Sequence, residues 1–155
     1  MFNEMRRKDR ELTKQEALEI LKKGEYGILT TIGTNGYPYG VPISYVYKNE
    51  KIYFHCAANI GTKVENIQAN PKVSFTVIGP TEVLPKSFST KYESVIAFGQ
   101  AKELKDEGKK EALIYIIEKY SSEHKEAGLK YIDNMFEKTG IYEVSIDYIS
   151  GKARR

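Results

Sequence analysis

The sequence is poor in the residues that build metal centres and disulfides: it has one cysteine, two histidines and no tryptophan. A single cysteine excludes a disulfide within the chain. Two histidines and one cysteine are also too few for a structural zinc site, which takes four such ligands. We therefore expect no metal centre and no disulfide framework.

Long apolar runs and an excess of one charge are also missing. No segment has the roughly 20 apolar residues of a membrane-spanning helix, and the first residues, MFNEMRRKDREL, lack the apolar core of a signal peptide. The 24 basic and 21 acidic residues leave a formal charge of only +3, which argues against nucleic acid as a partner. These absences predict a soluble cytoplasmic protein that binds neither membranes nor nucleic acid.

The composition is otherwise that of a globular protein, with 41% hydrophobic and 29% charged residues among 155. This length predicts one domain over residues 1–155. Residues 1–12 carry four basic side chains and little to bury, so we expect them to form a surface or flexible N-terminal arm. The 12 tyrosines favour a β-rich fold.

Local patterns predict the elements in turn. Thr13 to Glu16 form a capping box, which starts a helix that stops at Gly24. The segment Thr34-Asn35-Gly36 supplies a hairpin turn, and Pro42 interrupts the strand that follows, which marks an edge or a bulge. We expect strands at 26–32, 39–47, 52–56, 72–78, 93–104 and 141–149, a Pro-bearing connection at 79–92, helices at 106–120 and up to 137, and a polar stretch at 121–128. Short antiparallel strands followed by helices and a returning strand predict an α+β fold, mainly β, built on an antiparallel barrel with flanking helices.

The segment KIYFHCAANIGTKVENIQA at 51–69 raises two chemical hypotheses. The first is a reactive thiol at Cys56 beside His55. Neighbouring residues on a strand point to opposite faces, so these two side chains do not form a catalytic pair. A lone cysteine at a strand end is most often a small buried residue, and His55 is more often a packing residue than a catalyst.

The second hypothesis is an anion site at Gly61-Thr62-Lys63, where a helix is expected to begin. Free amides at a helix N-terminus attract phosphate, and the Thr62 hydroxyl and the Lys63 ammonium add a donor and a charge. A plain cap followed by a solvated lysine is the competing interpretation. A flat ligand against the backbone of Pro42 to Ser44, with its phosphate at Thr62 and Lys63, accounts for both unusual segments.

The order of these motifs resembles the FMN-binding split-barrel superfamily that includes pyridoxamine 5′-phosphate oxidase. Within it, the chain is most similar to the nitroimidazole-resistance (Nim-type) branch. The resemblance rests on MRRKDREL at 5–12, GYPYGVPISYVY at 36–47, IYFHCA at 52–57, YESVIAFGQA at 92–101 and SGKAR at 150–154.

The resemblance implies a homodimer that binds FMN between its subunits. It implies that Pro42, Ile43 and Ser44 line the isoalloxazine, that His55, Cys56 and Ala57 run beside it, and that Thr62 and Lys63 hold the phosphate. The partner subunit is expected to close the site through the region 88–94, which includes Tyr92 and Ser94. Relatives commonly have arginine or histidine where this chain has Thr62, so Lys63 is left as the main cation.

The activity that the resemblance implies is an FMN-dependent oxidoreductase. It takes electrons from a reduced nicotinamide, NAD(P)H, and passes them to a small oxidised acceptor such as a nitro-aromatic compound. Tyr45 and Tyr92 are candidates to stack on the acceptor, with a packing role as the alternative for each. The runner-up is a flavin- or heme-binding module without turnover. Pyridoxamine 5′-phosphate oxidation ranks lower, because the sequence shows no second basic cluster in the core for the phosphate of the substrate; Lys152, Arg154 and Arg155 lie at the extreme end and are more often a solvated tail than ligands.

Overall fold

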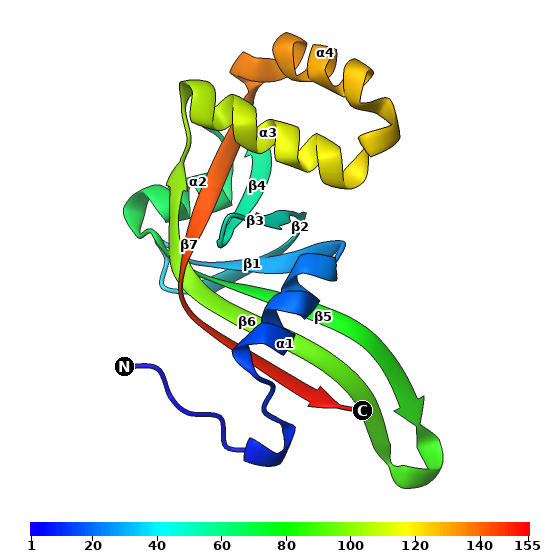
Figure 1. The fold of residues 1–155 in the computed structure, drawn as a ribbon. Coiled ribbons are helices and arrows are strands. Elements are labelled where there is room, and N and C mark those ends of the chain that lie inside the picture. Colours follow the sequence, from blue (N-terminus) through cyan, green and yellow to red (C-terminus); the bar gives the residue numbers. More distant parts are fainter.

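The computed structural model describes residues 1–155 and consists of one seven-stranded antiparallel sheet with four α-helices (Figure 1). The strands pair in the order β2-β1-β5-β6-β7-β4-β3. The strands are β1 (Tyr26–Ile32), β2 (Pro38–Ser44), β3 (Val46–Lys48), β4 (Lys51–Ala57), β5 (Lys72–Leu84), β6 (Ser89–Glu103) and β7 (Thr139–Arg154). The helices are α1 (Lys14–Lys23), α2 (Thr62–Ala69), α3 (Asp106–Tyr120) and α4 (Lys125–Met135). The α+β class and the antiparallel sheet are therefore confirmed.

The sheet is rolled into a split barrel. Its two outermost strands, β2 and β3, follow each other in the chain and are separated only by Tyr45. A single residue spans only about 3.5 Å, so the two margins of the sheet meet at this point. The interruption that the sequence predicts at Pro42 lies instead at Tyr45. Pro42 pairs with Ile28 inside β2, and the prediction of an edge strand at Pro42 is confirmed, because β2 pairs only with β1.

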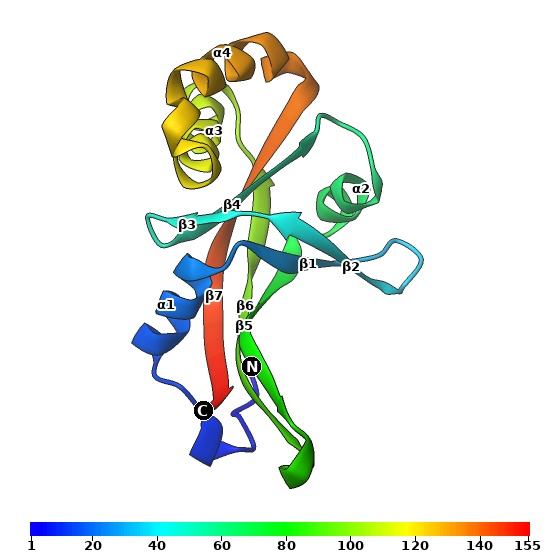
Figure 2. The ribbon, with the colours of Figure 1, turned by 90° about the vertical axis from the view of Figure 1, so that its right-hand side faces the viewer.

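Helices cover the barrel on three sides (Figure 2). Figure 2 shows α1 and α2 on opposite sides of the barrel and the α3–α4 hairpin above it. Leu21 of α1 and Val64 of α2 are buried in the same core as Leu29, Phe54 and Phe75. The α3–α4 hairpin has its own smaller core against β4 and β7, which includes Tyr53, Ala112, Ile116, Ile132 and Ile141.

One predicted connection is wrong, and a second is shorter than expected. The Pro-bearing segment 79–92 continues β5 and β6 into a long two-stranded ribbon that pairs Thr81 with Tyr92 after a bulge at Ile78/Thr81. Figures 1 and 2 show this ribbon reaching away from the barrel. The polar stretch 121–128 is a 3-10 turn (Ser122–His124) followed by the first residues of α4.

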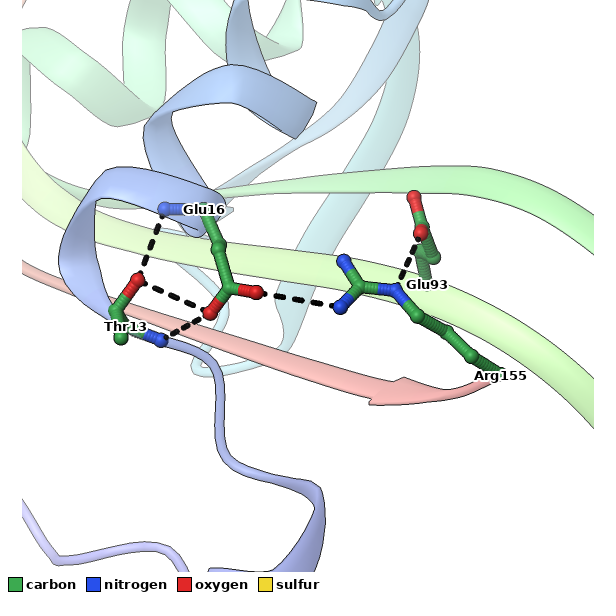
Figure 3. Close-up of polar contacts among 4 residues, drawn as sticks. All are labelled: Thr13, Glu16, Glu93 and Arg155. Carbon is green, nitrogen blue, oxygen red and sulfur yellow. Dashed lines mark hydrogen bonds and ion pairs between the residues drawn. The ribbon is translucent and has the colours of Figure 1, made fainter.

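The N-terminal arm crosses the outer surface of β6 and β7. The Phe2 ring stacks on the Tyr148 ring at 4.8 Å between centroids and lies 5.3 Å from that of Phe98. The backbone of Glu11 forms an isolated antiparallel β-bridge with that of Lys152. The arm then leads into α1, where the predicted capping box is present: Glu16 N–H donates to the Thr13 hydroxyl at 3.2 Å, and Thr13 N–H donates to the Glu16 carboxylate at 2.9 Å (Figure 3). No helix combines the length and the hydropathy that crossing a bilayer requires.

Candidate functional site

Two open strand edges face each other where the barrel is split. One is β2, whose only partner is β1. The other is the second half of β4, because β3 pairs only with Lys51 to Tyr53 and leaves residues 54–57 without a partner on that side. The two strands lie close together. Free backbone N–H and C=O groups along both edges are available to a ligand.

Side chains alternate along β2, as expected for an edge strand over a core. Ile43 is half-buried and packs against the main core. Pro42 and Ser44 are exposed on the outer surface. A ligand at this edge therefore meets the small side chains of Pro42 and Ser44 and the backbone of Ile43.

The chain leaves β4 and enters α2 at Gly61, as predicted. Gly61 has φ of 109°, a conformation that strongly favours glycine. No side chain caps α2, and the first bond of the helix is from Glu65 N–H to the Gly61 carbonyl at 3.1 Å. The amides of the first turn thus have no partner within the helix. Thr62 is exposed and Lys63 is half-buried beside them, so this helix start has the donors and the charge that an anion requires.

His55 and Cys56 point to opposite faces of β4, which confirms the argument against a catalytic pair. Cys56 packs against the main core, whereas His55 lies at the rim of a cavity beneath α3 and α4. Burial raises the pKa of the Cys56 thiol; Lys63 opposes this shift and Glu103 adds to it. Desolvation, with a smaller contribution from the Lys63 ammonium, lowers the pKa of His55. Both side chains are therefore neutral near pH 7.

Tyr45 does not reach the site. Its side chain is fully buried, its ring packs edge-on against Phe75 at 4.7 Å, and its hydroxyl donates to the Leu21 carbonyl. The suggestion that Tyr45 stacks on an acceptor is therefore wrong. Tyr45 has the alternative role, which is packing in the core.

Tyr92 and Ser94 do not lie on the strands that border the split. They belong to β6, which is three strands from β2 and two strands from β4 in the sheet. Burial alone raises the pKa of the Tyr92 hydroxyl, but hydrogen bonds from Arg10 and Lys152 outweigh it and lower that pKa. Neither residue meets Pro42 to Ser44 in one subunit.

Lys119 and Tyr120, at the end of α3, are neighbours of the site that sequence reasoning missed. The Lys119 ammonium donates to the carbonyls of Gly24 at 2.5 Å and Tyr45 at 2.7 Å. The Tyr120 hydroxyl accepts from Tyr45 N–H at 3.0 Å. Both residues line a hollow of about 630 Å³ together with Ser44. They stabilise the bend between β2 and β3 and so hold the end of the edge strand in place.

A rolled antiparallel sheet with an open edge and an uncapped helix beside it is the architecture of a small-ligand-binding split barrel. More specifically, the chain belongs to the pyridoxamine 5′-phosphate oxidase family, whose model matches residues 13–153. No match was found among the curated proteins.

Solved structures share this fold at low sequence identity. A proposed 5-nitroimidazole antibiotic resistance protein from Bacteroides thetaiotaomicron is 23% identical, with a TM-score of 0.75 over 92% of this chain and 86% of that one. An FAD-binding protein from Mesorhizobium loti is 26% identical, with a TM-score of 0.64 over 94% and 98%. An FAD- and heme-binding protein from Mycobacterium smegmatis is 16% identical, with a TM-score of 0.73 over 94% and 74%.

Proposed function

We propose that this protein is a homodimeric FMN-dependent oxidoreductase that transfers electrons from NAD(P)H to a small oxidised acceptor. The observation that carries the proposal is a set of three features at the split of the barrel: the open edge of β2, the open half of β4, and the uncapped start of α2 with Lys63. These match the ring and the phosphate of a flavin mononucleotide.

The backbone and side-chain groups at the split fit this cofactor. The isoalloxazine is flat and carries hydrogen-bonding atoms on its edge, so it suits strand edges with free backbone groups at Pro42 to Ser44 and at His55 to Ala57. The phosphate suits the free amides of α2, the Thr62 hydroxyl and the Lys63 ammonium. When bound, FMN supplies the redox chemistry, and the protein supplies binding, orientation and electrostatics.

The roles of the chain's residues follow from their chemistry. Lys63 neutralises phosphate charge; desolvation, with a smaller contribution from Lys63, lowers the pKa of His55 and keeps its imidazole neutral. Cys56 supplies a protonated thiol inside the barrel, so it takes no part as a nucleophile. Lys119 and Tyr120 hold the carbonyl and the amide of Tyr45, which keeps the β2 edge open.

In this proposal, a second subunit completes the flavin site. Tyr92 and Ser94 lie on β6, which does not border the split, but Tyr92 is at the base of the exposed ribbon 79–92, which is free to reach a partner. Phe88 at its tip is 97% exposed, and large exposed apolar side chains are typical of interaction surfaces.

The test is the flavin content of the purified protein and of a Lys63→Gln variant. The wild type is expected to retain or take up FMN, and identification of the released flavin by chromatography separates FMN from FAD. A charge-assisted hydrogen bond to phosphate contributes about 1.5–3 kcal/mol, so Lys63→Gln is expected to weaken FMN binding about 10- to 100-fold. The exposed Lys130→Gln on α4 is the matched control. A protein that takes up no flavin, or a Lys63→Gln variant that binds FMN as tightly as the wild type, contradicts the proposal.

A non-catalytic flavin- or heme-binding module is the second candidate. It is favoured by the names of two of the solved structures, which describe an FAD-binding protein and an FAD- and heme-binding protein. Anaerobic mixing with NADH and NADPH separates the two candidates. Bleaching of the flavin band, followed by reoxidation with a nitro-aromatic compound, supports the enzyme; an unreduced flavin supports the module.

The contacts of Arg155, at the C-terminal end, argue against pyridoxamine 5′-phosphate oxidation. Arg155 pairs with Glu16 at 3.2 Å and with Glu93 at 3.1 Å (Figure 3). The hydrogen bonds to Glu93 and Glu16 raise the pKa of the guanidinium. With two carboxylates bound, Arg155 is not free to hold the phosphate of a substrate.

A further inference from the structure

A small cavity lies beneath the α3–α4 hairpin, on the face of β4 that points away from the main core. It has a volume of about 130 Å³ and lies between the helix pair and the outer face of β4. Its wall is made by Leu113, Ile116, Ile117, Ile132 and Met135. Leu113, Ile116 and Ile132 are almost fully buried, so the deep part of the cavity is a hydrocarbon surface.

The close packing of the two helices shapes this cavity. α4 has a glycine where it crosses α3: a Cβ at Gly128 would lie 2.7 Å from Cγ2 of Ile117. The missing side chain lets α4 approach α3 closely, and Ile117 is thereby held between the helix contact and the cavity wall. The void is therefore bounded by well-packed side chains and not by a mobile loop.

The mouth of the cavity carries the polar groups. His55 enters from β4, and Thr139 and the exposed Tyr131 complete the rim. Since desolvation and Lys63 lower the pKa of His55, its ring presents one N–H donor and one nitrogen acceptor near pH 7. No carboxylate, lysine or arginine lines the cavity, and an ionic ligand would lose its hydration without a partner of opposite charge.

Size and lining together define a class of ligand. An engineered apolar protein cavity of about 150 Å³ stays free of water and binds benzene. We propose that the cavity beneath α3 and α4 binds a small uncharged aromatic or heteroaromatic molecule. The ring lies among Leu113, Ile116 and Ile132, and a polar ring atom exchanges a hydrogen bond with His55. This inference does not depend on flavin binding.

The experiment uses the full chain with ¹³C-labelled isoleucine methyl groups and three probes of one ring size: benzene, pyridine and benzoate. Benzene and pyridine are expected to shift the methyl signals of Ile116, Ile117 and Ile132 saturably. Benzoate, which is charged, is expected to bind at least about 10-fold more weakly. Absence of a saturable shift with both neutral probes, or equal binding of benzoate, overturns the inference.

Variants test the wall and the polar group separately. Ile132→Phe fills the deep end and is expected to abolish benzene binding; Ile117→Phe fills the cavity from its α3 wall and serves if the first variant does not fold. His55→Leu is expected to weaken pyridine binding about fivefold, the value of one hydrogen bond, and to leave benzene binding unchanged. The matched control is His124→Leu, since His124 is exposed outside the cavity. Benzene binding that survives both filling variants places the probe elsewhere and refutes the site.

The test of the cavity can be separated from the test of flavin binding. The titrations are run with and without bound FMN, and the methyl shifts are read directly from the cavity. A protein that takes up no FMN can still bind benzene, and a flavoprotein can still fail to do so.

Discussion

Replacing Lys119 by methionine tests how the bend between β2 and β3 is stabilised. Methionine keeps an unbranched apolar side chain but removes the ammonium that donates to the carbonyls of Gly24 and Tyr45. The ammonium also lies 4.0 Å from the centre of the Tyr45 ring. Burial lowers the pKa of Lys119 from its ordinary value of 10.5 to about 8, although Glu25 opposes this shift.

This shift determines how stability depends on pH. Below about pH 8 the amine is protonated in both the folded and the unfolded chain. Between about pH 8 and 10.5 the unfolded chain still binds the proton while the folded chain has released it, so the free energy of unfolding rises with pH in this window. The shift corresponds to about 3 kcal/mol for a fully desolvated group. Lys119 is only half-buried and keeps two carbonyl acceptors and two aromatic faces, so we expect about 1–2 kcal/mol.

The assay is urea unfolding, followed by circular dichroism, across this pH range. In the unfolded chain Cys56 and Tyr142 also titrate in this range, whereas burial in the folded chain raises the pKa of the thiol and raises that of the Tyr142 hydroxyl to about 12. These groups lower stability as pH rises, but they do so in the wild type and the variant alike. The quantity to follow is therefore the wild-type free energy of unfolding minus that of Lys119→Met, which should rise by about 1–2 kcal/mol between pH 8 and 10. Lys130→Met is the control and should follow the wild type; a constant or falling Lys119 difference would refute the reasoning.

Three further substitutions test the packing of the barrel through the urea midpoint. Gly99→Ala should destabilise by about 3 kcal/mol, because its Cβ would lie 2.2 Å from the Ser145 carbonyl oxygen; an unchanged midpoint would show that β6 is not held this closely to β7. Gly108→Ala, which meets nothing within 4 Å, should stabilise α3 by about 0.5–1 kcal/mol, and a loss would contradict the open surface at that position. Asn66→Ala should lose about 1–3 kcal/mol, because Asn66 donates to the Thr31 hydroxyl in the core at 3.0 Å; a neutral result would mean that this buried bond has no net effect.

Local rules were enough to predict several elements. The capping box at Thr13 and Glu16 depends only on neighbouring residues, and so does the start of α2 at Gly61. The edge position of Pro42 follows from its missing N–H. In these cases the stabilising partner lies within a few residues in the chain, so the sequence carries the information.

The ribbon at 79–92 could not be predicted in the same way. Its residues are largely exposed on both faces, so they lack the alternation of polar and apolar side chains that identifies a strand. Two prolines, Pro80 and Pro85, further suggested a loop. The pairing that forms the ribbon extends β5 and β6 outward from the barrel after a shift of register at Ile78/Thr81.

The same distinction between local signals and long-range contacts applies to the candidate flavin site. Thr62 and Lys63 were found because a helix start is a local signal. Lys119 and Tyr120 were missed because they contact Tyr45 from 74 and 75 positions further along the chain. A helical pattern places them at the end of α3 but does not say which backbone they meet. The assignment of Tyr45 to the acceptor failed for the same reason, since its burial depends on Leu21 and Phe75.

The one-residue link at Tyr45 has a mechanical consequence. Sliding β2 along β1 would pull β3 along β4, since no slack exists between them. The register of β2 on β1 is thus coupled to the register of β3 on β4, and a force applied to β2 or to β3 acts on both strands. The split can widen or narrow by bending of the sheet, but its two strand edges cannot shift lengthwise independently.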